Sequence, residues 1–260
     1  MDTARRVEEL LASGDPEKVR EGLEAIKAEI AEVGAENAGH MYGPLTTFFY
    51  IDPLDNPELK PMLDEALALV VGCGRCVIPV LLEQLDDSDL KAQIAAANAL
   101  GRIGADAIDP LMTAYSETDD TGRKAFIVYA LGHIRSSQVV RALEVALDAA
   151  SSDDRNLRDS GTRAIGRMVE KIPREKVDEE LLARMIEILR RNLGDPNPGI
   201  RAKAVRSLGK MAQRGYLEDE MCAWLRRVLA RILGEDEAND WDRAYIVRRE
   251  AREALAHCPG

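Results

Sequence analysis

A short phrase recurs along this chain and constrains its fold more than any other feature of the sequence. Its variants read AANALGRIG, VYALGHI, TRAIGRM and VRSLGKM. Each contains a small residue, an apolar residue, a glycine and, two positions after the glycine, a second apolar residue. Because these positions share one side of a helix, each phrase predicts the buried stripe of an amphipathic helix. The glycines are Gly101, Gly132, Gly166 and Gly209, and Ala256 stands at a fifth, degenerate position.

A second set of helices is predicted between these motif helices. The intervening segments carry their own apolar stripes, as in AIDPLMTAY, VVRALEVAL, ELLARMIEILRRNL and MCAWLRRVLARIL. Acidic turns such as Asp86-Asp87, Asp119-Asp120 and Asp153-Asp154 precede the motif helices, where aspartate offers an N-cap. Aromatic residues are only 4% of the chain, which favours close-packed helices over a β-sandwich. The sequence therefore predicts an all-α protein of stacked helix pairs.

The repeated phrase resembles the HEAT repeat, in the short variant found in phycobilin lyase subunits. That variant has a basic residue eight positions before the glycine. In this chain those positions hold Lys124, Arg158, Arg201, Arg248 and, as a departure, Gln93. The resemblance is good over residues 76–257 and weaker over 58–75. It implies an α-solenoid of about five HEAT-like helix pairs, in which the basic residue pairs with a turn aspartate of the same or a neighbouring repeat, and it implies little about activity.

The sequence divides into three parts. Residues 1–36 predict an N-terminal helical cap of two helices, the second of which starts at Asp15-Pro16 with a cap residue and a first-turn proline. Residues 37–57 predict a loop, and residues 58–260 predict the repeat solenoid. The loop holds four of the 11 aromatic residues, namely Tyr42, Phe48, Phe49 and Tyr50. It is too apolar for disorder, so it either folds over the end of the first repeat or contacts a ligand or partner.

Cys73 and Cys76 lie within the stretch VVGCGRCVIPVL and have the spacing of a metal or redox pair. Overlaying the 31-residue repeat aligns Cys73 with Gly104, which places GCGRC in a turn between helices, with Gly72 and Gly74 supplying left-handed backbone. A metal site needs more ligands, and no second paired spacing of cysteine or histidine occurs. A redox pair of this type follows a strand, and no strand is evident. We therefore favour a structural turn and expect no cofactor, and a metal site or a redox pair at Cys73 and Cys76 is the least favoured alternative.

The motifs of common catalytic sites do not occur in the sequence. It contains no glycine-rich phosphate loop, nucleophile elbow or paired-histidine helix. The many acidic pairs lie at turns or helix starts, where capping explains them, so we expect no enzymatic activity. No apolar run reaches the ~18 residues of a membrane span, and the first residues are charged. We expect no membrane association and a cytoplasmic location.

Charge is segregated between the two helix types. The four motif helices at residues 91–103, 122–135, 155–168 and 199–214 carry 14 Lys and Arg residues but only one acid, Asp159. The rest of the chain holds 21 basic and 45 acidic residues, and the net charge is −11. In HEAT solenoids the motif helices form the concave layer, so the resemblance implies a basic concave face within an acidic shell. The negative total disfavours nucleic acid, so we expect a protein partner with an acidic surface or segment.

Two columns of motif-helix positions are the candidate partner-binding residues. The first column lies three positions before the glycine and the second lies one position after it, so the two are a helical turn apart on one face. They comprise Asn98, Tyr129, Arg163 and Arg206 in the first column and Arg102, His133, Arg167 and Lys210 in the second. A cation in the last helical turn complements the helix dipole, which explains the second column without a partner. The first column has no such explanation, unless turn aspartates neutralise it in a structural ion-pair network.

The leading hypothesis is a non-enzymatic interaction module or scaffold that binds an acidic partner segment on a basic concave face. A phycobilin lyase-like subunit or chaperone is an alternative suggested by the repeat subtype. Another is a DNA-binding protein similar to the alkylpurine glycosylases with HEAT-like repeats, which place a catalytic aspartate beside aromatic residues on the groove. In this sequence only Asp159, near Tyr129, is a candidate for that aspartate.

Overall fold

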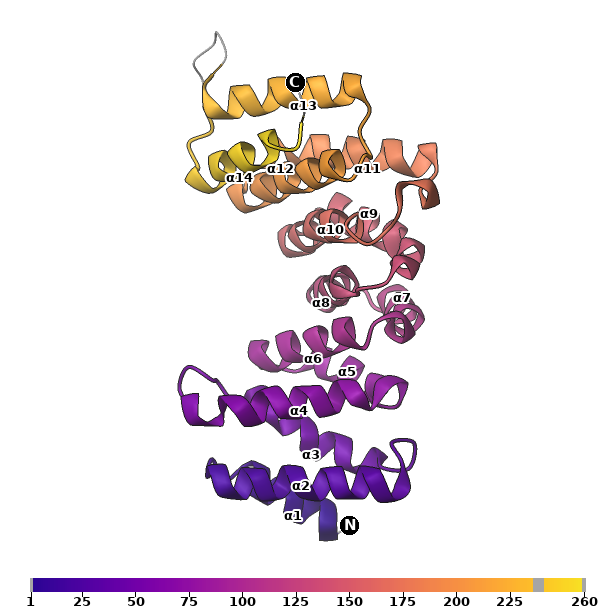
Figure 1. The fold of residues 1–260 in the computed structure, drawn as a ribbon, viewed down its shortest axis with the longest axis vertical. Coiled ribbons are helices and arrows are strands. Elements are labelled where there is room, and N and C mark those ends of the chain that lie inside the picture. The colour runs from indigo at the N-terminus through magenta and orange to yellow at the C-terminus, as the bar shows by residue number, and fades with distance from the viewer. Residues whose placement is uncertain (1, 236–240, 259–260) are drawn as a thin grey trace. The chain divides into compact units, whose positions relative to one another are not determined.

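The computed structural model describes residues 2–235 and 241–258, and the regular structure in these residues is helical. They form 14 α-helices joined by turns and 3-10 helices, and the described ranges contain no strand (Figure 1). The prediction of an all-α fold is confirmed. The chain divides into two compact units, one up to Ala114 and one from Tyr115 onward, with the boundary inside α7 (Ile108–Ser116). No single described helix has the length and hydropathy of a membrane span, although Pro57–Gly72 and Gly74–Asp86 meet that test together across a bend of 105°.

Unit 1 contains the predicted N-terminal helices and the first motif helix. Its α-helices before α7 are α1 (Asp2–Leu11), α2 (Pro16–Val33), α3 (Tyr42–Thr46), α4 (Lys60–Gly72), α5 (Ile78–Glu83) and α6 (Leu90–Ile103). Its 3-10 helices are η1 (Gly39–Met41), η2 (Thr47–Tyr50), η3 (Pro57–Leu59), η4 (Gly74–Val77), η5 (Gln84–Asp86) and η6 (Ala105–Ala107). Asp15 caps α2 by accepting two backbone hydrogen bonds, and Pro16 occupies its first turn, as the sequence predicts.

Residues 37–57 include short helices where the sequence predicts a loop. Glycine and proline interrupt the segment, but proline is compatible with the first turn of a helix, and the apolar residues follow helical spacing. Met41, Leu45 and Phe48 are at most 3% exposed. The helices of this segment pack against α1, α4 and α6. The segment is therefore part of the core of unit 1.

Unit 2 contains the other four motif helices. These are α8 (Thr121–His133), α10 (Arg155–Met168), α12 (Pro198–Gln213) and α14 (Tyr245–Leu255). The elements between them are η7 (Ser137–Ala142), α9 (Leu143–Ser151), η8 (Arg174–Lys176), α11 (Glu179–Asn192) and α13 (Asp219–Leu233). α10 packs against α8, α9 and α12, and α12 packs against α14. Consecutive motif helices of this unit are therefore neighbours.

The motif glycines bring consecutive motif helices of unit 2 close together. Gly132 lies against Ala164, Gly166 against Ser207 and Gly209 against Ala254. Each contacted residue is the small residue two positions before the next anchor, so the glycine and the small residue of the phrase are two sides of one contact. A Cβ atom added to Gly166 would lie 2.8 Å from the Cβ atom of Ser207, which is closer than packed carbon atoms tolerate. A larger residue in either column would push the helices apart.

Buried polar side chains connect four helices of unit 2. Ser207 Oγ of α12 donates to the carbonyl oxygen of Thr162 in α10 at 2.9 Å. Asn192 Nδ2 of α11 donates to Thr162 Oγ1 at 2.8 Å and to the carbonyl oxygen of Ala150 in α9 at 3.0 Å. These three polar residues are at most 2% exposed. Because their hydrogen bonds are made inside the protein, burial leaves them without a large desolvation penalty.

The N-caps expected from the acidic turns are partly confirmed. Asp120 and Asp154 accept hydrogen bonds from backbone N–H groups in the first turns of α8 and α10. The cap of α6 is Asp89, which lies after the Asp86-Asp87 pair that the sequence suggested. Asp87 accepts a hydrogen bond from the backbone N–H of Asp89 and so shapes the turn before the cap.

We expect Gly166→Ala to lower the free energy of unfolding by roughly 1–3 kcal/mol, because overpacking at this contact forces α10 and α12 apart. Gly72→Ala is the matched control, since no atom lies within 4 Å of a Cβ added at that helical glycine. The control should leave stability unchanged or raise it by up to about 1 kcal/mol, the difference in helix propensity. Urea unfolding followed by circular dichroism measures both effects. Equal losses in the two variants would contradict the close helix contact.

Candidate functional site

Arg158 and Arg201 fasten the turns that precede their motif helices. Arg158 Nε lies 2.7 Å from Asp195 Oδ2, and its Nη1 donates to two backbone carbonyls of the turn before α10. Arg201 repeats this arrangement with Asp242, through hydrogen bonds of 2.7 and 2.8 Å, and with two carbonyls of the turn before α12. Each arginine pairs with a turn aspartate of the following repeat, which confirms the structural role that the resemblance implies.

The other members of this basic column make different contacts. Gln93 Nε2 donates to a turn carbonyl at 3.0 Å and keeps the turn contact without a charge. Lys124 Nζ lies 4.9 Å from the centre of the Tyr115 ring. Arg248 donates to two turn carbonyls and stacks on Trp241 at 4.5 Å. At every position of this column, the side chain therefore makes a contact within the chain.

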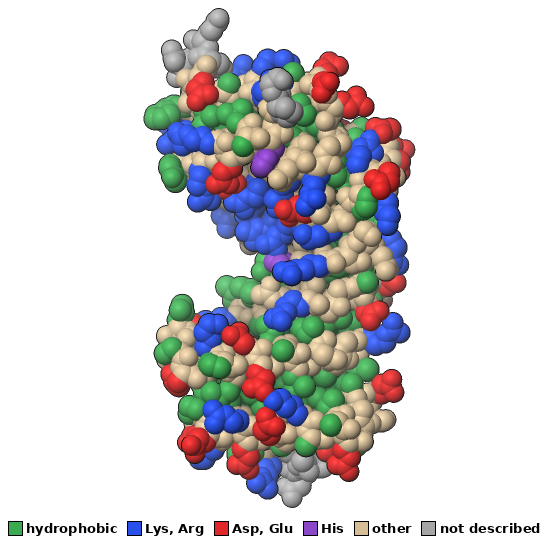
Figure 2. Space-filling model, in the orientation of Figure 1, with side chains coloured by type: hydrophobic (Ala, Val, Ile, Leu, Met, Phe, Trp, Pro, Cys, Tyr) green, Lys and Arg blue, Asp and Glu red, His purple; other side chains and the backbone are tan. Residues whose placement is uncertain are grey.

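Arg163 and Arg167 of α10 and Arg206 and Lys210 of α12 form what we call the basic face of unit 2. The members of each pair are four residues apart, so their side chains share one side of the helix. Arg167 lies within electrostatic range of both Arg163 and Arg206. Figure 2 shows Lys and Arg side chains gathered over α10, α12 and α14. The structure therefore brings together the columns that the sequence predicts on α10 and α12.

Glutamates from neighbouring elements neutralise two members of the basic face. Arg206 Nε lies 2.7 Å from Glu250 Oε2 of α14, and Arg206 Nη2 donates to the second carboxylate oxygen. Glu250 is 1% exposed and also pairs with Arg249 at 2.9 Å. Although burial raises the pKa of Glu250, the hydrogen bonds from Arg206 and Arg249 hold it below its ordinary value. Lys210 Nζ lies 2.8 Å from Glu170 Oε2, so glutamates take the place of the turn aspartates that the sequence suggested.

His133 accepts a hydrogen bond beside the basic face and is not a cation. Its Nδ1 lies 2.7 Å from the carbonyl oxygen of Tyr129, and because a carbonyl only accepts, Nδ1 carries the proton. Its Nε2 then accepts a hydrogen bond from Arg167 Nη1. Burial lowers the pKa of His133, and the charges of Arg167 and Arg163 lower it further. The expectation of a cation that complements the helix C-terminus is therefore wrong at His133.

Arg163 has no acceptor within the part of the chain that the structure describes. Its Nε atom is shielded from solvent and makes no hydrogen bond. Its charge adds to the effect of burial in lowering the pKa values of Arg167 and His133. A shielded N–H group without an acceptor costs free energy. An anion that approached Arg163 would gain charge-assisted hydrogen bonds without displacing an acceptor.

The two candidates in unit 1 have different surroundings. Asn98 of α6 lines an apolar cavity of about 330 Å³ together with Phe48, Phe49 and Ile94. Arg102 is exposed at the end of the same helix, and no described residue forms an ion pair with it. We therefore restrict the basic face to unit 2.

Three of the four aromatic candidates belong to the core of unit 1. Tyr42, Phe48 and Phe49 are at most 6% exposed, and the hydroxyl of Tyr42 donates to a backbone carbonyl. Tyr50 is 44% exposed, and its hydroxyl donates to Asp87. Tyr50 is therefore the aromatic side chain of this segment that a partner reaches most readily.

Cys73 and Cys76 lie where α4 gives way to η4, which is the turn predicted by the repeat overlay. Gly74 has a φ of +58°, whereas Gly72 ends α4 without a positive φ, so one of the two predicted glycine roles is found. Both thiols are free, and burial raises the pKa of Cys73, which disfavours the thiolate that redox chemistry and metal binding require. No group of three His, Cys, Asp or Glu side chains in the described ranges is placed to hold a metal ion.

Two glutamates at this face, Glu170 and Glu250, were not predicted from the sequence, whereas Asp159 was. Asp159, the candidate of the glycosylase alternative, forms an ion pair with Lys203 of α12. Glu250 was missed because the charge count stopped at four motif helices and left out the fifth, where acids reappear. The acidic residues of this fifth helix were the sequence signal that could have predicted an ion pair with the arginines of α12. The pairing of Glu170 with Lys210 had no signal, because it depends on where the chain turns after α10.

Known proteins share the repeat and the fold. The family model for HEAT repeats matches residues 78–166. Residues 78–166 are HEAT repeats. The comparison with curated proteins found no match.

Solved structures similar to this chain are HEAT and armadillo repeat proteins. A chain from the CpcE–CpcF complex of phycocyanin lyase from Nostoc sp. PCC7120 has 21% identity and a TM-score of 0.52, covering 68% of this chain and 96% of its own. A designed armadillo repeat protein in complex with the peptide (KR)4 has 15% identity and a TM-score of 0.51 over 100% of both chains. A chain from the structure of Kap95p with RanGDP has 14% identity and a TM-score of 0.60, covering 93% of this chain but 36% of its own. At these identities the similarity shows the fold, and the predicted α-solenoid class is confirmed.

Arg206 and Arg163 stand at the same position of two consecutive repeats, and their replacement by glutamine should differ in cost. Arg206→Gln leaves the buried Glu250 with Arg249 alone and should lower the free energy of unfolding by roughly 1–3 kcal/mol. Arg163→Gln removes no ion pair and should change it by less than about 0.5 kcal/mol. Chemical denaturation of both variants makes the comparison. A loss at Arg163 as large as that at Arg206 would show that Arg163 belongs to the scaffold.

Acid should destabilise the protein partly through His133. Because burial and nearby cations lower its folded-state pKa, the unfolded chain takes up the proton first as pH falls, and stability decreases. Thermal unfolding at pH values between about 7.5 and about 5.5 measures this loss. His133→Gln keeps a hydrogen-bonding side chain without titrating and should show a smaller decrease in Tm over the same range. An unchanged pH profile in this variant would exclude a neutral His133 as the cause.

Proposed function

We propose that this protein is a non-enzymatic scaffold whose basic face in unit 2 binds an acidic segment of another protein. The repeat fold supports a role in protein interaction, because successive helix pairs present an extended surface to a partner. The three similar structures described above are themselves complexes, one of CpcE with CpcF, one with the peptide (KR)4 and one of Kap95p with RanGDP. Repeat solenoids of this kind are typical of non-enzymatic scaffolds.

The observation that carries the proposal is that Arg163 is the cation of the basic face without an acceptor among the described residues. Like charges four residues apart on a helix cost roughly 0.2–0.5 kcal/mol per pair. On α12, glutamates offset the charges of Arg206 and Lys210. On α10, Arg167 donates to a neutral His133, but Arg163 has no acceptor among the described residues. Arg163 adds nothing to the stability of the fold, so its presence is better explained by binding of an acidic group from a partner.

The same face favours a short acidic peptide over nucleic acid. Asp159, Glu170 and Glu250 lie among its cations, and the whole chain carries a charge of −11. Nucleic acid binding draws on several uncompensated cations that each neutralise a phosphate. A single carboxylate side chain needs one guanidinium group, which Arg163 supplies.

Binding of a fluorescein-labelled, glutamate-rich peptide, followed by fluorescence anisotropy, tests the proposal. Arg163→Gln is expected to weaken binding about tenfold, which corresponds to the loss of roughly 1.4 kcal/mol from a charge-assisted contact. Arg214→Gln is the matched control, since it removes one exposed positive charge just after α12. The control should change the affinity by less than about twofold.

A second peptide with glutamine in place of each glutamate tests whether charge is required. Its binding should be undetectable at concentrations that saturate the acidic peptide. Equal affinity for the two peptides, or the same loss in Arg163→Gln and Arg214→Gln, would contradict the proposal. Circular dichroism melts of both variants separate a lost contact from a lost fold.

A further inference from the structure

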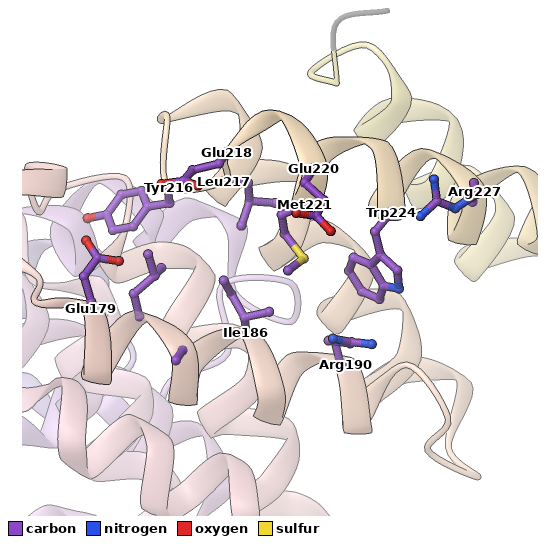
Figure 3. Close-up of a pocket in the computed structure, with 12 residues that line it drawn as sticks. Glu179, Ile186, Arg190, Tyr216, Leu217, Glu218, Glu220, Met221, Trp224 and Arg227 are labelled. Atoms are coloured by element: carbon purple, nitrogen blue, oxygen red, sulfur yellow. The ribbon is translucent and has the colours of Figure 1, made fainter.

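A groove lies between α11 and α13 of unit 2, on helices that do not contribute to the basic face. Its volume is about 390 Å³. Its apolar lining, which we call the groove floor, consists of Leu182, Ile186, Leu217, Met221 and Trp224. Figure 3 shows Ile186, Met221 and Trp224 extending into the space between the two helices. An apolar concavity of this size with charged residues at its edge is typical of a binding site.

The contacts across this groove differ from those across the preceding pair of helices. Between α9 and α11, Arg184 makes two hydrogen bonds of 2.7 Å to the carboxylate of Glu144. Between α11 and α13, Arg190 stacks on Trp224 at 4.5 Å. A guanidinium that stacks on an indole ring keeps its N–H groups free to bond at its edge. Arg190 therefore presents donors at the rim of the groove.

The two ends of the groove carry opposite charges. Figure 3 shows Glu218 at one end, Arg190 and Arg227 at the other, and Glu220 between them beside Met221. Glu218 precedes α13, and its side chain makes no capping hydrogen bond there. Neither Glu218 nor Arg227 takes part in an ion pair with a described residue, and both are exposed. Their charges are therefore available to a bound segment.

We propose that this groove binds an extended segment of another protein in which a large apolar side chain stands between a basic and an acidic residue. The apolar side chain packs on the groove floor, the basic residue faces Glu218, and the acidic residue faces Arg227. Glu218 and Arg227 are nine positions apart, which spans roughly 13 Å along a helix. An extended chain covers that length in about four residues, and alternate residues share one face. A helix of the same length has fewer than three turns and is marginal in isolation.

The test uses the full chain with Trp241→Phe, which leaves Trp224 as its one tryptophan. The fluorescence of Trp224 is recorded while each of three peptides with blocked termini is added. The peptides are Lys-Ser-Leu-Ser-Glu, Glu-Ser-Leu-Ser-Glu and Lys-Ser-Leu-Ser-Lys. The mixed-charge peptide is expected to bind about tenfold more tightly than either of the others, because each of them brings one like charge to the rim. A fourth peptide, Lys-Ser-Ser-Ser-Glu, lacks the apolar side chain and should not bind measurably.

Charge-reversal variants test the assigned ends of the groove. Glu218→Lys is expected to shift the preference to the peptide with two glutamates, and Arg227→Glu is expected to shift it to the peptide with two lysines. Both positions are exposed, so the fold should be retained. Tyr245→Lys changes an exposed aromatic residue of α14 outside the groove and should leave the preference unchanged.

Ile186→Glu places a charge on the groove floor and should abolish binding of the mixed-charge peptide. Equal affinity for the three leucine peptides, unaltered preferences in the charge-reversal variants, or no Trp224 signal with any peptide would overturn the proposal. Sedimentation velocity tests whether a second copy of this chain binds in the groove. Self-association that Ile186→Glu abolishes would assign the groove to a second copy of this chain and would also overturn it.

Discussion

Consecutive motif helices of unit 2 approach closely because a glycine on each helix faces a small residue on the next. The three contacts join Gly132 to Ala164, Gly166 to Ser207 and Gly209 to Ala254. They place the residues one position after the glycine beside their counterparts on the neighbouring helix, which is how Arg167 reaches the imidazole of His133. They also bring the column three positions before the glycine next to the following helix, where Arg206 meets Glu250. The spacing of the helices thereby determines which charges become neighbours.

Electrostatics within this layer follow from those neighbours. Close packing buries Glu250 and half-buries His133, and their surroundings then favour the charged form of the carboxylate and the neutral form of the imidazole. The ionised Glu250 attracts the nearby cations, and the neutral His133 adds no positive charge beside them. Arg163 gains no such compensation from the described residues. The basic face therefore combines two cations that pair with glutamates, one that donates to a neutral histidine, and Arg163, which has no acceptor among the described residues.

Features that follow the repeat period, such as the motif helices and the arginine column, could be predicted from the sequence. Features that depend on contacts between distant parts of the chain could not. The phrase located the motif helices, because its small and apolar positions recur at helical spacing. The arginine column located ion pairs such as Arg158 with Asp195, because its spacing to the turn is constant. The charge state of His133 and the pairing of Lys210 with Glu170 were out of reach, since they depend on side chains more than 30 positions away. The helices within residues 37–57 were missed because glycine and proline masked an apolar pattern that the core of unit 1 completes.

The central claim is that Arg163 takes its acceptor from a partner, and nuclear magnetic resonance of arginine Nε–H groups tests it most directly. The Arg163 resonance is assigned by its loss in Arg163→Gln, and the glutamate-rich peptide is then added to the unmodified chain. The account predicts that this resonance shifts on binding, as the guanidinium that carries it gains an acceptor, while the resonances of Arg158 and Arg201, already held by Asp195 and Asp242, stay in place. An unchanged Arg163 resonance at saturating peptide would contradict the account.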